Sequence, residues 1–224
     1  LNLSINKCLE IGWTSDTTYQ YLVNIDKNID YHVLDISKEL LEKAPKNLNK
    51  ICVDHDKWNS EEKQFNLVIS NFYMHLTDNL ERSFNIINNT LSKNGFFIAS
   101  IPSDQFLKEL KHAMLLTDLR LYTGAYKRFN DGFSINNINS FLKKSNFKDI
   151  IIDIDVIEIQ YSSFQKLLKD IKNLGNSYMR LDKKKYFENK NYFKHVEEIY
   201  WDNFSKNNKI NLTLEIIYFS GWKI

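Results

Sequence analysis

Apolar runs alternate with helical patterns through the first hundred residues of the chain. Continuous apolar runs predict strands at 7–11, 31–35, 50–54, 66–70 and 96–100, and amphipathic patterns predict helices at 17–23, 37–44 and 80–91. Strands that are apolar on both faces and separated by helices pair in parallel, with helices covering both faces of the sheet. The pattern therefore predicts a doubly wound, Rossmann-like α/β sheet that is mostly parallel.

The pattern changes after Asp104. Helices are expected at 105–120, 136–144 and 163–174, and strands at 149–156 and 212–222. Two late strands joined by a long helical excursion indicate an antiparallel hairpin added at one edge of the sheet. We expect a single domain over 1–224, composed of a ligand-binding half at 1–103 and a covering half at 104–224.

Local signals add detail to this pattern. Ser37 is the expected N-cap of the helix at 37–44, and Lys93-Asn94-Gly95 is the expected turn before the fifth strand. The aromatic residues within 192–204 recur at roughly helical spacing, which is typical of a packed face. The lysines at 183–185 are expected on a solvated face.

Composition excludes several classes of protein. A formal net charge of +2 argues against a nucleic-acid binder that works through a broad basic field. The two cysteines, Cys8 and Cys52, form neither a disulfide framework nor a zinc cluster, which favours a reducing compartment. No apolar run reaches the length of a membrane span, and no signal-peptide pattern is present. Because the chain begins at Leu1, we expect that preceding residues are missing. The expected location is the cytoplasm, or the mitochondrial matrix if a targeting segment was trimmed.

Polar residues stand where successive predicted strands end. In an open α/β sheet these carboxyl ends meet at one edge, where ligands bind. Gly12 supplies a tight turn before a helix whose free N–H groups face the ligand. The Asp35 carboxylate offers two acceptor oxygens, which suit the two hydroxyls of a ribose. Glu10, Gly12 and Asp35 are expected at this edge. Asp54 and His55 are expected beside an adenine ring, and Asn71 and Phe72 beside the reactive end of the ligand.

Ordinary structural interpretations exist for the candidate residues as well. Asp35 precedes a helix and could simply cap it, and His55 lies in a polar loop. His75 is either a general base or a loop residue held by hydrogen bonds. Arg120 and Arg128 lie in the segment expected to cover the pocket and are candidates for substrate binding, although basic residues on solvated helix faces are commoner.

The histidines of the chain do not indicate a metal site. His32, His55, His75, His112 and His195 form no spaced ligand set, and iron held by two histidines and a carboxylate would need one. We therefore predict that no metal is bound.

The strand ends carry a set of short motifs: Glu10-Ile11-Gly12, 33–37, 53–54 and 65–70. This set resembles the successive motifs of class I S-adenosylmethionine-dependent methyltransferases. Further segments, at 70–76, 91–98, 107–110, 153–155, 174–177 and 217–223, are similar to one subgroup. That subgroup contains the respiratory complex I assembly factor that hydroxylates an arginine of a complex I subunit, and it is related to the malonyl-acyl-carrier-protein O-methyltransferases.

The resemblance implies that S-adenosyl-L-methionine is the cofactor. It places cofactor contacts at Glu10, Gly12, Asp35, Ile36, Asp54, His55 and Asn71, with Thr14 and Phe72 beside them. Thr14 and Asp16 stand where the family has its second and third glycines. A side chain at Thr14 narrows the approach to the ligand, and the Asp16 carboxylate lies near the methionine end. Both departures bear on cofactor affinity and hence on activity.

The resemblance also implies an enzyme that methylates or hydroxylates its substrate. Methyl transfer depends mainly on positioning, with His75 as a general base where the nucleophile carries a proton. The implied partner is a protein substrate on a respiratory complex I subunit. Two alternatives stay open: a non-catalytic assembly protein with a degenerate cofactor pocket, and a small-molecule or carboxyl O-methyltransferase.

Overall fold

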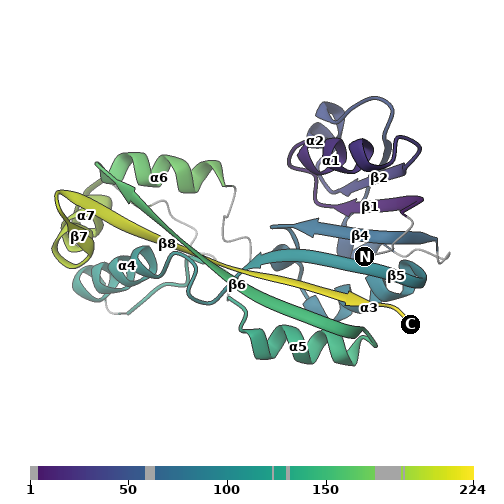
Figure 1. Cartoon of the computed structure of the whole chain (residues 1–224). Coiled ribbons are helices and arrows are strands. Elements are labelled where there is room, and N and C mark those ends of the chain that lie inside the picture. Colours follow the sequence, from purple (N-terminus) through teal and green to yellow (C-terminus); the bar gives the residue numbers. More distant parts are fainter. Residues whose placement is uncertain (1–4, 59–63, 123, 130–131, 175–187, 189) are drawn as a thin grey trace. The chain divides into compact units, whose positions relative to one another are not determined.

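The computed structural model describes residues 5–58, 64–122, 124–129, 132–174, 188 and 190–224. The chain divides into two compact units (Figure 1). The first unit comprises Leu1–Ile101, Phe133–Ile154 and Ile217–Ile224, and the second comprises Pro102–Gly132 and Asp155–Ile216. The expectation of a single domain over 1–224 stays a prediction.

The first unit is built around parallel strands. Its elements are β1 Lys7–Ile11, α1 Thr17–Ile25, β2 Asp30–Asp35, α2 Lys38–Lys43, β3 Asn49–Cys52, the 3-10 helix η1 His55–Lys57, β4 Phe65–Asn71, the 3-10 helix η2 Met74–Leu76, α3 Leu80–Thr90, β5 Leu91–Pro102 and α5 Ile135–Lys144. Parallel pairing joins β1 to β2 and to β4, β2 to β3, and β4 to β5. With the later strands β6 (Lys148–Tyr161) and β8 (Lys209–Trp222), the full strand order is β3-β2-β1-β4-β5-β8-β6, which confirms the predicted doubly wound sheet.

Both faces of this sheet are buried. Leu9 and Ile11 of β1 pack in a cluster with Phe84 of α3, whereas Cys8 packs in a second cluster with Leu22 of α1. Neighbouring strand residues point to opposite faces, so a run such as Cys8-Leu9 contributes to both clusters. This arrangement explains why the strands are apolar without alternation.

Two long strands contribute residues to both units: β6 Lys148–Tyr161 and β8 Lys209–Trp222. They extend the sheet beyond β5 as predicted, with β8 as the neighbour of β5 and β6 at the end of the order. The short strand β7 Ser205–Lys206 pairs antiparallel with β8.

The second unit holds α4 Lys108–Leu121, α6 Phe164–Asn173 and α7 Lys190–Phe204. Tyr192, Val196 and Tyr200 are buried at four-residue intervals along α7, which confirms the predicted packed face. The buried Glu109 carboxylate accepts hydrogen bonds from the Thr213 backbone N–H and hydroxyl.

Some local predictions need correction. The turn expected at 93–95 lies inside β5, because Asn94 N–H donates to the Lys223 carbonyl and Lys223 N–H donates to the Gly95 carbonyl. The helix expected from residue 105 begins at Lys108, since the Ser103 hydroxyl accepts from Gln105 N–H and holds that segment in a turn. The predicted helix stop at Gly175 and the lysines at 183–185 lie outside the described residues. Among the described helices, none combines the length and apolarity that a membrane crossing needs.

Candidate functional site

The Gly12 turn lies at the carboxyl end of the first unit's parallel strands. Gly12 has a φ of +86°, in the left-handed region that favours glycine, and its N–H donates to the Leu34 carbonyl at 2.8 Å. The Ser70 hydroxyl of β4 donates to the Ile11 carbonyl at 2.9 Å. The end of β1 is therefore fixed to both of its neighbouring strands.

Asp35 joins this turn to the end of β2. Its carboxylate is 4% exposed, with Oδ2 accepting from Trp13 N–H at 2.9 Å and Oδ1 accepting from Ser37 N–H at 2.7 Å. An ionised carboxylate can accept about four hydrogen bonds, so each oxygen retains acceptor capacity. Ile36, the next residue, is 59% exposed and adds apolar surface beside the carboxylate. Together they offer a polar acceptor pair next to an apolar patch.

Glu10 is a buried acid at the end of β1, only 1% exposed. Its Oε2 accepts from the Tyr31 hydroxyl at 2.7 Å, and Thr18 of α1 also hydrogen-bonds to it. Burial raises the Glu10 pKa to about 7, against the lowering effect of these two hydrogen bonds. Asn71 of β4 donates to the Thr18 hydroxyl at 3.4 Å, so the amide and the acid share one network.

This buried acid predicts a pH dependence of stability. The pKa of Glu10 is about 7 in the folded protein and 4.5 in the unfolded chain, so folding favours the protonated acid. The contribution of Glu10 to the free energy of unfolding is therefore present below pH 4.5 and is lost as the pH rises from 4.5 through 7. Glu10→Gln keeps the neutral form at every pH. We expect the two proteins to match near pH 4.5 and the variant to be more stable by about 3 kcal/mol at pH 8. Urea unfolding across this range measures the difference.

Glu42→Gln serves as the control, since Glu42 is exposed on α2 and forms an exposed pair with Lys38. Its stability difference from the wild type should stay flat with pH. A flat difference for Glu10→Gln as well would contradict the assignment of a raised pKa.

His55 lies buried at the start of η1, after β3. Its ring is 1% exposed, and neither ring nitrogen has a hydrogen-bond partner within the described part of the chain. Burial lowers the His55 pKa, while Asp56 and Asp54 oppose that shift. Asp54 caps η1 by accepting from Asp56 N–H at 3.1 Å. Buried polar atoms are nearly always hydrogen-bonded, so the His55 ring is a candidate ligand contact.

The segment after β4 completes the edge. Asn71 is exposed there, and Phe72 has a φ of +53°, a conformation that costs a non-glycine residue on the order of 1 kcal/mol. His75 is buried in η2 with its ring edge-on to that of Phe72, at 5.7 Å between centroids. Its role as a general base stays a prediction.

The two departures at the predicted glycine positions lie along the turn before α1. Thr14 is exposed, and Asp16 is the N-cap residue of α1 without a side-chain capping hydrogen bond. The Asp16 carboxylate instead accepts from Gln20 at 2.5 Å, one helical turn further on. The Asp16 carboxylate therefore lies beside the first turn of α1.

Arg120 and Arg128, the predicted substrate residues, belong to the second unit. Arg128 is 14% exposed, and its guanidinium pairs with the buried Asp118 and with Glu188. It also lies 4.5 Å from the centroid of the Tyr192 ring. Arg120 is exposed and approaches Glu198 at 3.9 Å. The contacts of Arg128 are those of a packed ion pair, and a substrate role for either arginine stays a prediction.

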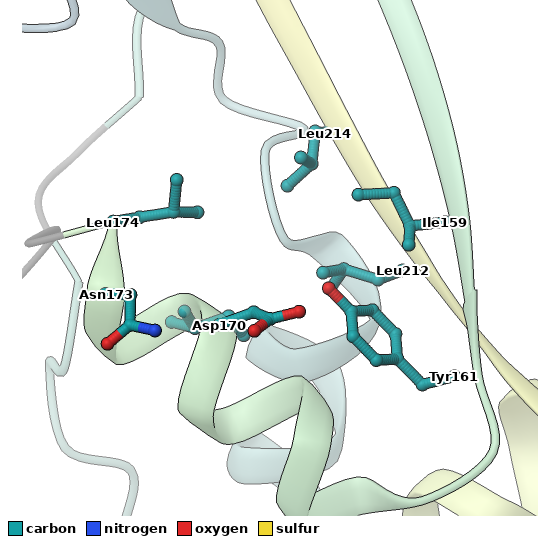
Figure 2. Close-up of a pocket in the computed structure, with 8 residues that line it drawn as sticks. Ile159, Tyr161, Asp170, Asn173, Leu174, Leu212 and Leu214 are labelled. Carbon is teal, nitrogen blue, oxygen red and sulfur yellow. The ribbon is translucent and has the colours of Figure 1, made fainter.

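A separate pocket of about 330 Å³ lies in the second unit. Ile159, Leu212 and Leu214 give it apolar walls, and α6 adds Asp170. Figure 2 shows the Tyr161 hydroxyl directed toward the Asp170 carboxylate, consistent with the hydrogen bond between them. No sequence motif pointed to this pocket, because its lining comes from β6, β8 and α6.

A family model described as a methyltransferase domain matches residues 3–151, about two thirds of the chain. The chain belongs to this methyltransferase family. Its predicted resemblance to class I S-adenosylmethionine-dependent methyltransferases is thereby confirmed.

Two curated relatives agree with the predicted subgroup. An arginine-hydroxylase of Dictyostelium discoideum (NDUFAF5, mitochondrial) is 27% identical over 99% of this chain and 56% of the relative. Malonyl-[acyl-carrier protein] O-methyltransferase 1 of Ilyobacter polytropus is 27% identical over 94% of this chain and 77% of the relative. The chain thus spans little more than half the length of the first of these relatives. A solved putative methyltransferase from Bacillus halodurans has the same fold, with a TM-score of 0.65 at 9% identity over 99% of this chain and 94% of that one.

Three residues at this edge of the sheet were not predicted from the sequence: Tyr31, Thr18 and Tyr73. Tyr31 could have been found, because it lies on the same face of β2 as Val33, the register partner of Glu10. Thr18 and Tyr73 carried no such signal, since loop and helix geometry bring them to the edge. Among the described residues, no group of three or more histidines, cysteines or acids is arranged to hold a metal ion.

Proposed function

We propose that this protein binds S-adenosyl-L-methionine at the carboxyl ends of β1 to β4 and works as an enzyme of the methyltransferase family. The observation that carries the proposal is the Asp35 carboxylate, held by Trp13 and Ser37 N–H groups beside the Gly12 turn. A carboxylate so placed can accept from both hydroxyls of a ribose. The exposed Ile36 then supports an adenine ring.

The remaining groups of the edge fit the rest of the cofactor. Glu10 and Asn71 share a hydrogen-bond network that suits the ammonium group of the methionine moiety. Buried His55, with two unused ring nitrogens among the described residues, suits the polar edge of adenine. When bound, the cofactor supplies an electrophilic methyl on a sulfonium. The protein's contribution is to hold the substrate nucleophile in line with that methyl and to exclude water.

The substrate is the second part of the proposal. The Dictyostelium relative is named as an arginine-hydroxylase and the Ilyobacter relative as an O-methyltransferase of an acyl-carrier protein. The second name specifies a group carried on a protein, and the first specifies arginine, a side chain that proteins carry. We infer a protein substrate, for which the subgroup resemblance implies a respiratory complex I subunit and a role in its assembly. Its location is then the mitochondrial matrix or a bacterial cytoplasm.

Calorimetric titration with S-adenosylmethionine tests the cofactor site. We expect saturable binding that falls at least about tenfold in Asp35→Asn, since an amide accepts at one atom only and loses a charge-assisted hydrogen bond. Asp153→Asn is the matched control, because Asp153 is an exposed carboxylate of the first unit. It should bind like the wild type. Absence of binding at millimolar cofactor by folded wild-type protein would overturn the proposal and favour a non-catalytic assembly protein.

A further inference from the structure

Tyr73 packs directly on the Gly12 turn. A Cβ placed on Gly12 would lie only 2.4 Å from the Tyr73 Cβ and Cγ atoms and 2.5 Å from Cδ2. Carbon atoms of unbonded residues pack at 3.5–4.0 Å, so no side chain fits between them. The absent side chain of Gly12 is therefore what admits the Tyr73 ring to the edge of the sheet.

The Tyr73 ring also lies near His55, in the segment that follows β3. Its centroid lies 6.4 Å from that of the His55 ring, and the two rings are edge to face. The strand order β3-β2-β1-β4 puts the end of β2 between the Gly12 turn and His55. The last residue of β2 is Asp35. The Tyr73 ring follows β4, packs on the Gly12 turn and lies near His55, so it stands at the end of β2, within electrostatic reach of Asp35.

The electrostatics of the phenol agree with this placement. Burial raises the Tyr73 pKa well above its usual value, and the nearby Asp35, Asp54 and Asp56 carboxylates raise it further. The phenol, which is protonated at neutral pH even without this shift, therefore lies in the field of the acids that end β2 and precede η1.

The backbone before Tyr73 holds the ring in this position. Phe72 N–H donates to the Ser100 carbonyl at 2.9 Å, the last such bond beyond β4, and Phe72 itself has the left-handed φ of +53°. Tyr73, the next residue, packs on the turn that follows β1. Strained backbone of this kind is concentrated at functional sites.

We propose that the Tyr73 ring occupies the nucleoside's place above Asp35 in the cofactor-free protein, so that S-adenosylmethionine binds only after the ring has rotated away. The inference rests on the proposed function, because it concerns the same edge. A ring and a ribose cannot both lie against Asp35 between Gly12 and His55. The measured affinity is then the intrinsic affinity multiplied by the fraction of molecules with the ring turned out.

Three variants test this inference by calorimetry and by stopped-flow association with S-adenosylmethionine. Tyr73→Ala removes the ring and should bind about tenfold more tightly, with faster association, as expected when a competing closed state is abolished. Tyr73→Phe keeps the ring and should stay within about threefold of the wild type. Tyr21→Ala removes a tyrosine that is 69% exposed on α1 and should change nothing. Circular dichroism and thermal melting confirm that each variant is folded.

Each outcome separates the two proposals. If all proteins bind S-adenosylmethionine and the affinity of Tyr73→Ala is no higher than that of the wild type, only the closed state is overturned. The Tyr73 ring then lines the pocket of the bound cofactor. Binding by Tyr73→Ala but not by the wild type supports the closed state and overturns the proposed function of the wild-type protein. Folded proteins that show no binding in either the wild type or Tyr73→Ala overturn the proposed function and the closed state with it.

Discussion

Gly12→Ala is expected to destabilise the protein by about 3 kcal/mol, from overpacking together with a left-handed backbone that L residues resist. The new methyl would meet the Tyr73 ring at 2.4 Å while φ stays near +86°. The turn also carries the Trp13 N–H bond to Asp35, so its distortion should abolish cofactor binding at the same time. Urea unfolding and calorimetric titration measure the two effects.

The double variant Gly12→Ala/Tyr73→Ala separates the two causes. Removing the ring abolishes the close contacts with Tyr73 Cγ and Cδ2, but the contact with Cβ and the backbone strain remain. Part of the lost stability should therefore return, and the two effects should be non-additive. Gly124→Ala is the matched control, because nothing lies within 4 Å of its added Cβ. Fully additive losses in the double variant would show that the Tyr73 ring does not press on Gly12.

Arg128→Met is expected to cost 3–5 kcal/mol, roughly the penalty for removing one partner of a buried ion pair. The Asp118 side chain is 1% exposed and that of Glu188 is 9% exposed, so the substitution leaves two buried carboxylates without their cation. Burial alone lowers the Arg128 pKa, but the hydrogen bonds that its guanidinium donates to Asp118 and Glu188 outweigh burial and raise the pKa. Thermal and urea unfolding measure the loss in the free energy of unfolding.

Arg120→Met provides the comparison for Arg128. Arg120 is exposed, and its approach to Glu198 at 3.9 Å makes an exposed ion pair worth less than about 1 kcal/mol. Its unfolding curve should nearly overlay that of the wild type. If Arg128→Met instead kept full stability and lost only substrate turnover, the arginine would act on substrate, as the sequence first suggested.

Much of the first unit could be predicted because its signals are local. The apolar run at 7–11 is β1 without change, and Ser37 caps α2 by accepting from Leu40 N–H, as expected. The polar residues at the strand ends fall at one edge because parallel pairing fixes where each strand stops. Pairing Glu10 with Val33 and Ile69 brings the ends of three strands together without further information.

The sequence by itself determined the sheet, its parallel pairing and the edge that holds Gly12 and Asp35, because periodicity and strand ends are properties of neighbouring residues. Only the tertiary structure decided which side chains meet there. The hydrogen bond from Tyr31 to Glu10 and the packing of Tyr73 on Gly12 join residues distant in sequence. The pairing of Lys223 with Asn94 and Gly95, which turned a predicted turn into strand, likewise joins distant residues. Such contacts depend on packing and burial, which no local pattern encodes.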